Sequence, residues 1–156
     1  MSEMIIRMLI EAFFASVASV GFAMVFNVPK YTLIYCAIGG AITYIARTLC
    51  LHSGFGIEIS TFLAATFIGI IALYWSRKHL IPRPVYTVAS IIPMIPGTYA
   101  FTAMISLVDM NTHGVTQQLI GLFVFNGLKA VSILGAISFG LALPSLYFMR
   151  LNRPII

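Results

Sequence analysis

Five long apolar stretches follow one another along the chain, separated by short segments that contain proline, glycine, asparagine or basic residues. They cover about residues 5–26, 31–51, 57–76, 84–108 and 115–149. A helix that crosses a bilayer needs about 20 consecutive, mostly apolar residues, and each stretch meets this requirement. The pattern predicts an all-α integral membrane protein, a bundle of about five transmembrane helices that forms a single domain over residues 1–156.

The fourth stretch has no charged residue, but Pro93, Pro96 and Gly97 lie at its middle. A proline lacks the backbone N–H and clashes with the carbonyl four residues before it, and glycine adopts backbone conformations closed to other residues. We therefore predict that the fourth span is broken between Pro93 and Gly97, into half-helices over residues 85–92 and 98–108. A simple kink at one proline is the alternative.

The last stretch is longer than a span requires, because 35 helical residues would measure roughly 50 Å. It either tilts and projects from the bilayer as one helix, or breaks near Lys129 or Pro144.

Composition supports the bilayer as the solvent. Apolar residues make up 60% of the chain and charged residues 8%, whereas a soluble domain carries roughly 25% charged residues. A net charge of +5 would suggest nucleic acid as the partner of a soluble protein. In a membrane protein it indicates basic cytoplasmic loops, so we expect a lipid bilayer and no nucleic acid.

The basic residues also predict the orientation. A chain with its N-terminus outside and its C-terminus inside places two of them, Arg7 and Arg47, on the outer side. The inner side then holds Lys30, Arg77, Lys78, Arg83, Arg150 and Arg153. The positive-inside rule favours this N-out, C-in arrangement.

A broken span has a chemical consequence. Its second half-helix would present the amides of Thr98 to Phe101 and the positive end of the helix dipole, which suit a carboxylate. Secondary transporters place their substrates at such broken helices near the middle of the membrane. We therefore predict a substrate-binding or gating site at Pro93, Pro96, Gly97 and Thr98.

Ionisable residues inside spans usually face the interior of the bundle. Arg47 and Glu58 flank one short loop, and they could form either a structural salt bridge or a proton or ion-pair site for transport. Asn126 and Lys129 are three residues apart and share a helical face, which adds both to the predicted substrate site. Alternatively, Lys129 snorkels to the membrane surface.

Signatures of enzymes are not found in the sequence. It contains no nucleotide-binding glycine loop, no catalytic serine motif and no metal-ligand spacing. We expect no catalytic residues, no metal site, no cofactor and no enzymatic activity. Any transport would then be driven by a gradient.

Three segments resemble the threonine/serine exporter family. They are GFAMVFNVP at 21–29, the Ser53-Gly54 turn that leads to IEISTF at 57–62, and above all TVASIIPMIPG at 87–97. Length and spacing resemble the small stand-alone subunit of this family, the YjjB type. The resemblance makes Pro93, Pro96 and Gly97 signature positions, with Glu58 and Asn126 as weaker matches.

The resemblance implies a multi-pass protein of the bacterial inner membrane that works beside a larger YjjP-type subunit. The split form of the family is associated with succinate export and the fused form with threonine and serine. The expected function is the small subunit of a two-component secondary exporter of a small carboxylate, with succinate as the first choice. The alternatives are an amino-acid exporter subunit and a non-transporting assembly subunit, and a homo-oligomer is compatible with each.

Overall fold

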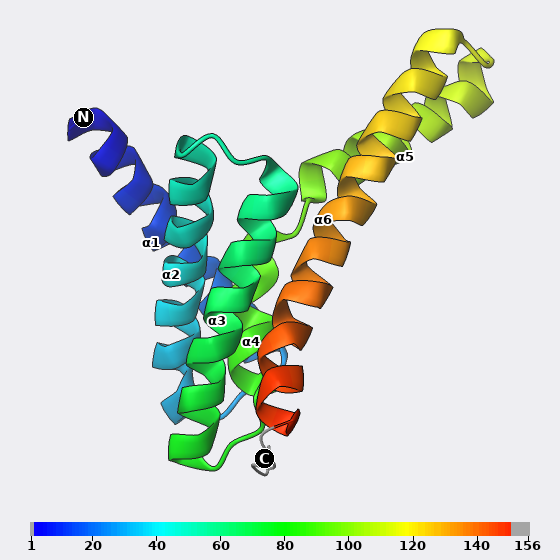
Figure 1. The fold of residues 1–156 in the computed structure, drawn as a ribbon. Helices are drawn as coiled ribbons and strands as arrows, with labels where there is room; N and C mark the ends of the chain where they lie inside the picture. The colour runs from blue at the N-terminus through cyan, green and yellow to red at the C-terminus, as the bar shows by residue number, and fades with distance from the viewer. Residues whose placement is uncertain (1, 151–156) are drawn as a thin grey trace. The chain divides into compact units, whose positions relative to one another are not determined.

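The computed structural model describes residues 2–150, and the chain in this range is built from helices (Figure 1). The order of the elements is α1 (Ser2–Val25), η1 (Lys30–Thr32), α2 (Leu33–His52), α3 (Ile57–His79), α4 (Pro84–Ile91), η2 (Ile92–Met94), α5 (Gly97–His113) and α6 (Gln117–Arg150). Helices α1, α2, α3 and α6 are each long and apolar enough to cross a membrane, and α4, η2 and α5 together make a fifth span if they count as one. The predicted all-α class and number of spans are confirmed.

The N-out, C-in orientation stays a prediction, and Arg153, one of the basic residues behind it, lies outside the described residues. Contacts within the chain divide it into two compact units. The first unit runs up to Met94 and resumes at Ala136, and the second is Ile95–Gly135.

Two consecutive glycines of α2 form the tightest contacts of the first unit. A Cβ atom on Gly39 would overlap the side chain of Ser90 in α4, and one on Gly40 would overlap the side chain of Ser19 in α1. Both serines are fully buried. Small residues at helix interfaces let backbones approach closely in membrane proteins, and α2 accordingly packs against α1, α3 and α4.

The last part of α6 packs against α3 through a second pair of glycines. A Cβ on Gly69 would lie 3.1 Å from the ring of Pro144, and one on Gly140 would lie 2.7 Å from the carbonyl oxygen of Phe62. Pro144 lies inside α6 without ending it. The final apolar stretch is therefore one helix of 34 residues, which decides between the two expectations for it.

The turn between α3 and α4 is fixed by hydrogen bonds. Leu80 adopts the left-handed conformation, with φ 55°, which lets the Ile81 amide donate to the Ser76 carbonyl at 3.3 Å. In return, the Ser76 hydroxyl donates to the Ile81 carbonyl at 2.6 Å. This turn positions Arg83, whose Nη2 donates to the Leu141 carbonyl of α6 at 2.8 Å.

The close approach at Gly40 predicts a loss of stability on substitution. Gly40→Ala would force a methyl group against Ser19 and, at 3.1 Å, against the Ala15 carbonyl oxygen, which belongs to a backbone that cannot rotate away. Overpacking of this kind costs about 1–3 kcal/mol. We expect a clearly lower midpoint of thermal unfolding for Gly40→Ala in detergent.

The matched control is Gly21→Ala, since a Cβ there meets no atom within 4 Å. Alanine is the better helix former, so this variant should melt at the same temperature as the unaltered protein or slightly higher. Equal destabilisation by the two substitutions would contradict the role assigned to Gly40.

Candidate functional site

The helix break lies where the sequence predicts it. Helix α4 ends at Ile91, residues Ile92–Met94 form a single 3₁₀ turn, and α5 starts at Gly97 with Pro96 as its N-cap. Proline at positions 93 and 96 removes two amide donors from the helical ladder. The Gly97 amide turns back to the Ile95 carbonyl at 2.8 Å, so the backbone between the two prolines leaves helical geometry.

A cation from the neighbouring helix reaches the end of the break that belongs to the first unit. Nη1 of Arg47 in α2 donates to the carbonyl oxygen of Met94 at 3.3 Å. Met94 is fully buried. In a continuous helix its carbonyl would accept the amide of Thr98, four residues later, and the departure of the chain from helical geometry prevents this. The guanidinium therefore occupies the place of a lost backbone donor.

The sequence indicated Arg47 but not its acceptor, because a proline frees the carbonyl four residues before it, which for Pro93 and Pro96 is the carbonyl of Ala89 and of Ile92. The carbonyl of Met94 is released by the path of the chain after it, and a position between two prolines is the signal that could have indicated it.

Glu58 lies in the first turn of α3, just after the turn that follows α2. Its Oε2 would be 3.3 Å from a Cβ on Gly56, so the carboxylate folds back over the residue that precedes the helix. A negative charge is favourable at a helix N-terminus. This explains the position of Glu58 locally, and its pairing with Arg47 stays a prediction.

Ser60, two residues after Glu58, is a buried polar residue that the sequence did not single out. Its side chain is fully buried, and its hydroxyl has no hydrogen-bond partner among the described residues. Buried hydroxyls are normally satisfied. Its place in the IEISTF segment was visible in the sequence, but its burial was not.

In the second unit, Pro96, Gly97 and Thr98 form the start of α5. The Ala100 amide donates to the Pro96 carbonyl at 3.0 Å, so the expectation of exposed amides from Thr98 to Phe101 is wrong for its later part. The helix starts one residue earlier than predicted, and the first-turn amides without a helical acceptor are those of Thr98 and Tyr99.

Asn126 and Lys129 both make local contacts along α6. The Asn126 side-chain amide donates to the Leu122 carbonyl, one turn earlier, at 2.8 Å. The Lys129 ammonium lies 6.0 Å from the centre of the Phe125 ring, at the outer limit of a cation–π contact. These contacts align both side chains with their own helix, and both expected roles of Lys129 remain predictions.

The contact at the break in the first unit joins an arginine and a backbone carbonyl. Within residues 2–150, no three His, Cys, Asp or Glu side chains lie close enough together to hold a metal ion. Outside the spans, burial lowers the pKa of the Arg83 guanidinium, which nevertheless remains charged because arginine titrates so far above neutral pH. Arg83 is thus a second half-buried cation that, like Arg47, donates to a backbone carbonyl.

Comparison with known proteins agrees with the signature segments. A family model described as threonine/serine exporter, ThrE, matches residues 11–147, which include Arg47, Glu58 and the whole break. No solved structure matches the chain. Since the match covers most of the sequence, the chain belongs to the threonine/serine exporter family.

Proposed function

We propose that this chain is a membrane subunit of a secondary exporter, and that Arg47 and the broken span form part of the path of a small carboxylate. Membership in an exporter family suggests a transporter rather than an enzyme, and the apolar helices suggest a multi-pass membrane protein. The observation that carries the proposal is the hydrogen bond from Arg47 to the Met94 carbonyl at the break.

That hydrogen bond suggests how a substrate would act. A carbonyl oxygen is a neutral acceptor, whereas a carboxylate carries the opposite charge and can accept two parallel N–H bonds from one guanidinium. A carboxylate that reaches Arg47 would therefore displace the Met94 carbonyl. The 3₁₀ turn at Ile92–Met94 would lose this hydrogen bond to α2 and be free to rearrange.

This exchange links binding to conformation, which alternating access requires. A ligand shifts an equilibrium only by its difference in affinity for the two states. Here the difference would arise because Arg47 bonds either to the substrate or to the backbone at the break. Thr98, Asn126 and Lys129 of the second unit keep the substrate-binding or gating role expected from the sequence, and Glu58 of the first unit keeps the proton or ion-pair role.

For the substrate we propose succinate, with a larger YjjP-type subunit as the partner in the bacterial inner membrane. The spacing of its signature segments, which resembles that of the small subunit, supports this proposal. The description of the matching family, threonine/serine exporter, favours an amino acid as the second candidate. An amino acid brings an ammonium group that needs an anionic partner, and the half-buried Glu58 would provide it.

Reconstitution tests the proposed function. Vesicles that hold this chain alone, the larger subunit alone, or both should be loaded with labelled succinate or labelled threonine. We expect efflux of succinate to require both chains, because each would supply part of the path. Efflux of threonine but not succinate would move the assignment to the second candidate, and full activity of the larger subunit alone would make this chain an assembly subunit.

Substitution of Arg47 tests the site itself. Arg47→Gln keeps a hydrogen-bond donor but removes the charge that a carboxylate needs. Hydrogen bonds to charged groups contribute about 1.5–3 kcal/mol, so efflux at low substrate concentration should fall about tenfold or more. Efflux by Arg47→Lys should lie between that of the unaltered protein and that of Arg47→Gln. Lysine retains the positive charge but lacks the planar guanidinium group.

The control is Arg7→Gln, which removes an exposed arginine from the first half of α1. It should leave efflux unchanged. If Arg47→Gln transports normally in a complex that is fully expressed, Arg47 has no role in substrate binding.

Removal of the break is a separate test. The double variant Pro93→Ala, Pro96→Ala restores two amide donors and favours a continuous helix. We expect loss of efflux while the amount of protein in the membrane stays the same. Pro82→Ala, at an exposed position between α3 and α4, is the control and should remain active. Unchanged efflux in the double variant would show that the break is not part of the path.

A further inference from the structure

An apolar groove lies between α3 and the end of α6, within the first unit. Its lining consists of Thr66, Ile70, Leu143, Pro144 and Tyr147, and its volume is about 460 Å³. Several of these side chains are large, apolar and exposed: Tyr147 is 67% exposed and Ile70 is 49% exposed. Such a surface needs an apolar occupant.

The groove leads toward a cluster of basic residues. Helix α3 ends with Arg77, Lys78 and His79. Arg77 follows Ile70 by seven residues, which is two helical turns, so it lies on the same face about 10 Å farther along the helix. A chain molecule in the groove would thus have a cation near one end.

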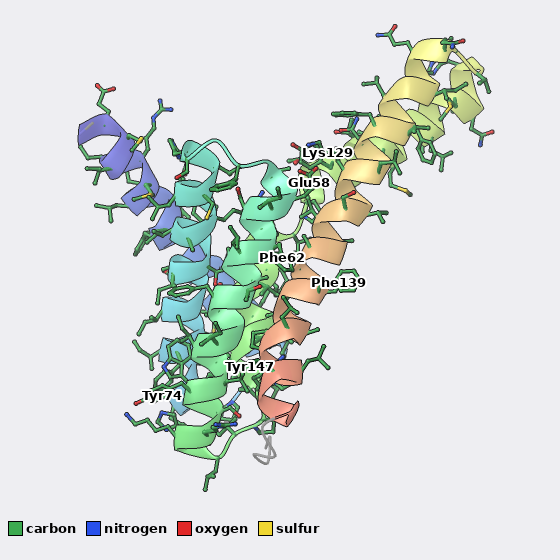
Figure 2. All side chains as sticks on the ribbon, in the orientation of Figure 1. Glu58, Phe62, Tyr74, Lys129, Phe139 and Tyr147 are labelled. Carbon is green, nitrogen blue, oxygen red and sulfur yellow. The ribbon has the colours of Figure 1, made fainter. Side chains whose placement is uncertain are left out.

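Helix α6 approaches the same end. Gly140 lies against Phe62 and Pro144 against Gly69, so the two helices run in the same direction. Tyr147 therefore lies toward the basic end of α3, as does Tyr74, while Glu58 lies at the opposite end (Figure 2). Tyrosine is enriched where a helix meets the membrane surface, which is consistent with lipid headgroups at this end of the groove.

We propose that this groove binds an anionic phospholipid, with an acyl chain against Ile70 and Leu143 and the phosphate near Arg77 and Lys78. Basic pockets between membrane helices bind the headgroups of acidic lipids. The apolar lining suits a hydrocarbon chain and offers nothing to a small carboxylate, so this site is separate from the proposed transport path.

The size of the groove favours a lipid chain over a helix from another subunit. Its wall on α3 is formed by Thr66 and Ile70, which are a single turn, or about 6 Å, apart. A helix that is 10–12 Å across with its side chains fills roughly 400–600 Å³ in each 5.4 Å turn, so the groove would hold only about one turn of it. The basic residues at the end of the groove also favour a lipid, because they would pair with its phosphate group.

Native mass spectrometry tests the proposal on the full chain. The protein is equilibrated with mixed micelles that contain equal amounts of phosphatidylglycerol and phosphatidylcholine, and the retained lipids are counted. We expect the unaltered protein to retain phosphatidylglycerol preferentially. A basic residue near an anionic surface contributes about 1 kcal/mol, or about fivefold in affinity, so Arg77→Gln with Lys78→Gln should largely abolish the preference.

Two further variants test whether the lipid preference depends on the positive charge at the end of α3. Arg77→Lys retains the charge and should retain most of the preference. Lys30→Gln removes an exposed charge from the same end of the bundle, because α2 and α3 are antiparallel neighbours, and it should change nothing. A loss in Lys30→Gln as large as in the Arg77 and Lys78 variant would reduce the effect to general electrostatics and overturn the proposal.

The acyl-chain part of the site is tested by Ile70→Trp, which fills the groove and should lower phosphatidylglycerol retention. Ile34→Trp, at an exposed position of α2, is the control for an added tryptophan. Equal retention of the two lipids by the unaltered protein would overturn the proposal. So would a result in which Ile70→Trp releases a protein subunit while the lipid count stays the same.

Discussion

The close contact between Gly39 of α2 and Ser90 of α4 sets the register on which the candidate site depends. Helices α2 and α4 run in the same direction along this contact, and Met94 follows Ser90 by four residues while Arg47 follows Gly39 by eight. The long side chain of Arg47 spans the remaining distance to the Met94 carbonyl. A larger residue at position 39 would push the helices apart, because a Cβ there already overlaps Ser90. The glycine contact and the arginine contact are therefore parts of one arrangement.

The bilayer explains why arginines bind backbone carbonyls here. In the hydrocarbon core, no water molecule donates a hydrogen bond to an unpaired carbonyl. Helix breaks therefore persist only where another group forms hydrogen bonds with the exposed backbone. Arg47 does this beside Pro93. Arg83 donates to the Leu141 carbonyl, three residues before Pro144, where the ring of the proline also packs on Gly69. In both places an arginine from a neighbouring segment donates to a backbone carbonyl close to a proline, within a span at Pro93 and outside the spans at Arg83.

Much of the fold could be predicted from the sequence, because spans need long apolar stretches and prolines break helices locally. The predicted ends were less accurate. The third stretch was ended at Ser76, at the first basic residue, but α3 continues to His79. Helical hydrogen bonds do not require apolar side chains, and basic residues are favourable at a helix C-terminus. The last stretch is a single helix because the ring of Pro144 packs against Gly69. This contact joins residues far apart in the chain, so the sequence pattern does not predict it.

In the candidate site too, features set by neighbouring residues could be predicted, and features set by contacts between distant residues could not. The break at Pro93 and Pro96 follows from the chemistry of proline, so the sequence was sufficient to place it. The acceptor of Arg47 depends on the register between α2 and η2, and the burial of Ser60 depends on the packing of α3. Neither could be inferred from the spacing of residues. The Ala100 amide was wrongly expected to lack a helical acceptor, because the helix starts at Gly97, one residue earlier than predicted. A sequence does not fix the first residue of a helix to a single position.

The contrast between rigid and weak parts of the backbone also bears on how an exporter of this architecture would work. The glycine contacts hold α1, α2 and α4 close together, whereas the 3₁₀ turn and the two prolines lack a complete set of helical hydrogen bonds. Binding energy delivered at Arg47 would act on the weaker part. The exchange of one hydrogen bond for a charged pair amounts to about 1–2 kcal/mol, which shifts an equilibrium roughly tenfold. That is enough to bias a segment that is already broken, and too little to separate helices packed through glycine.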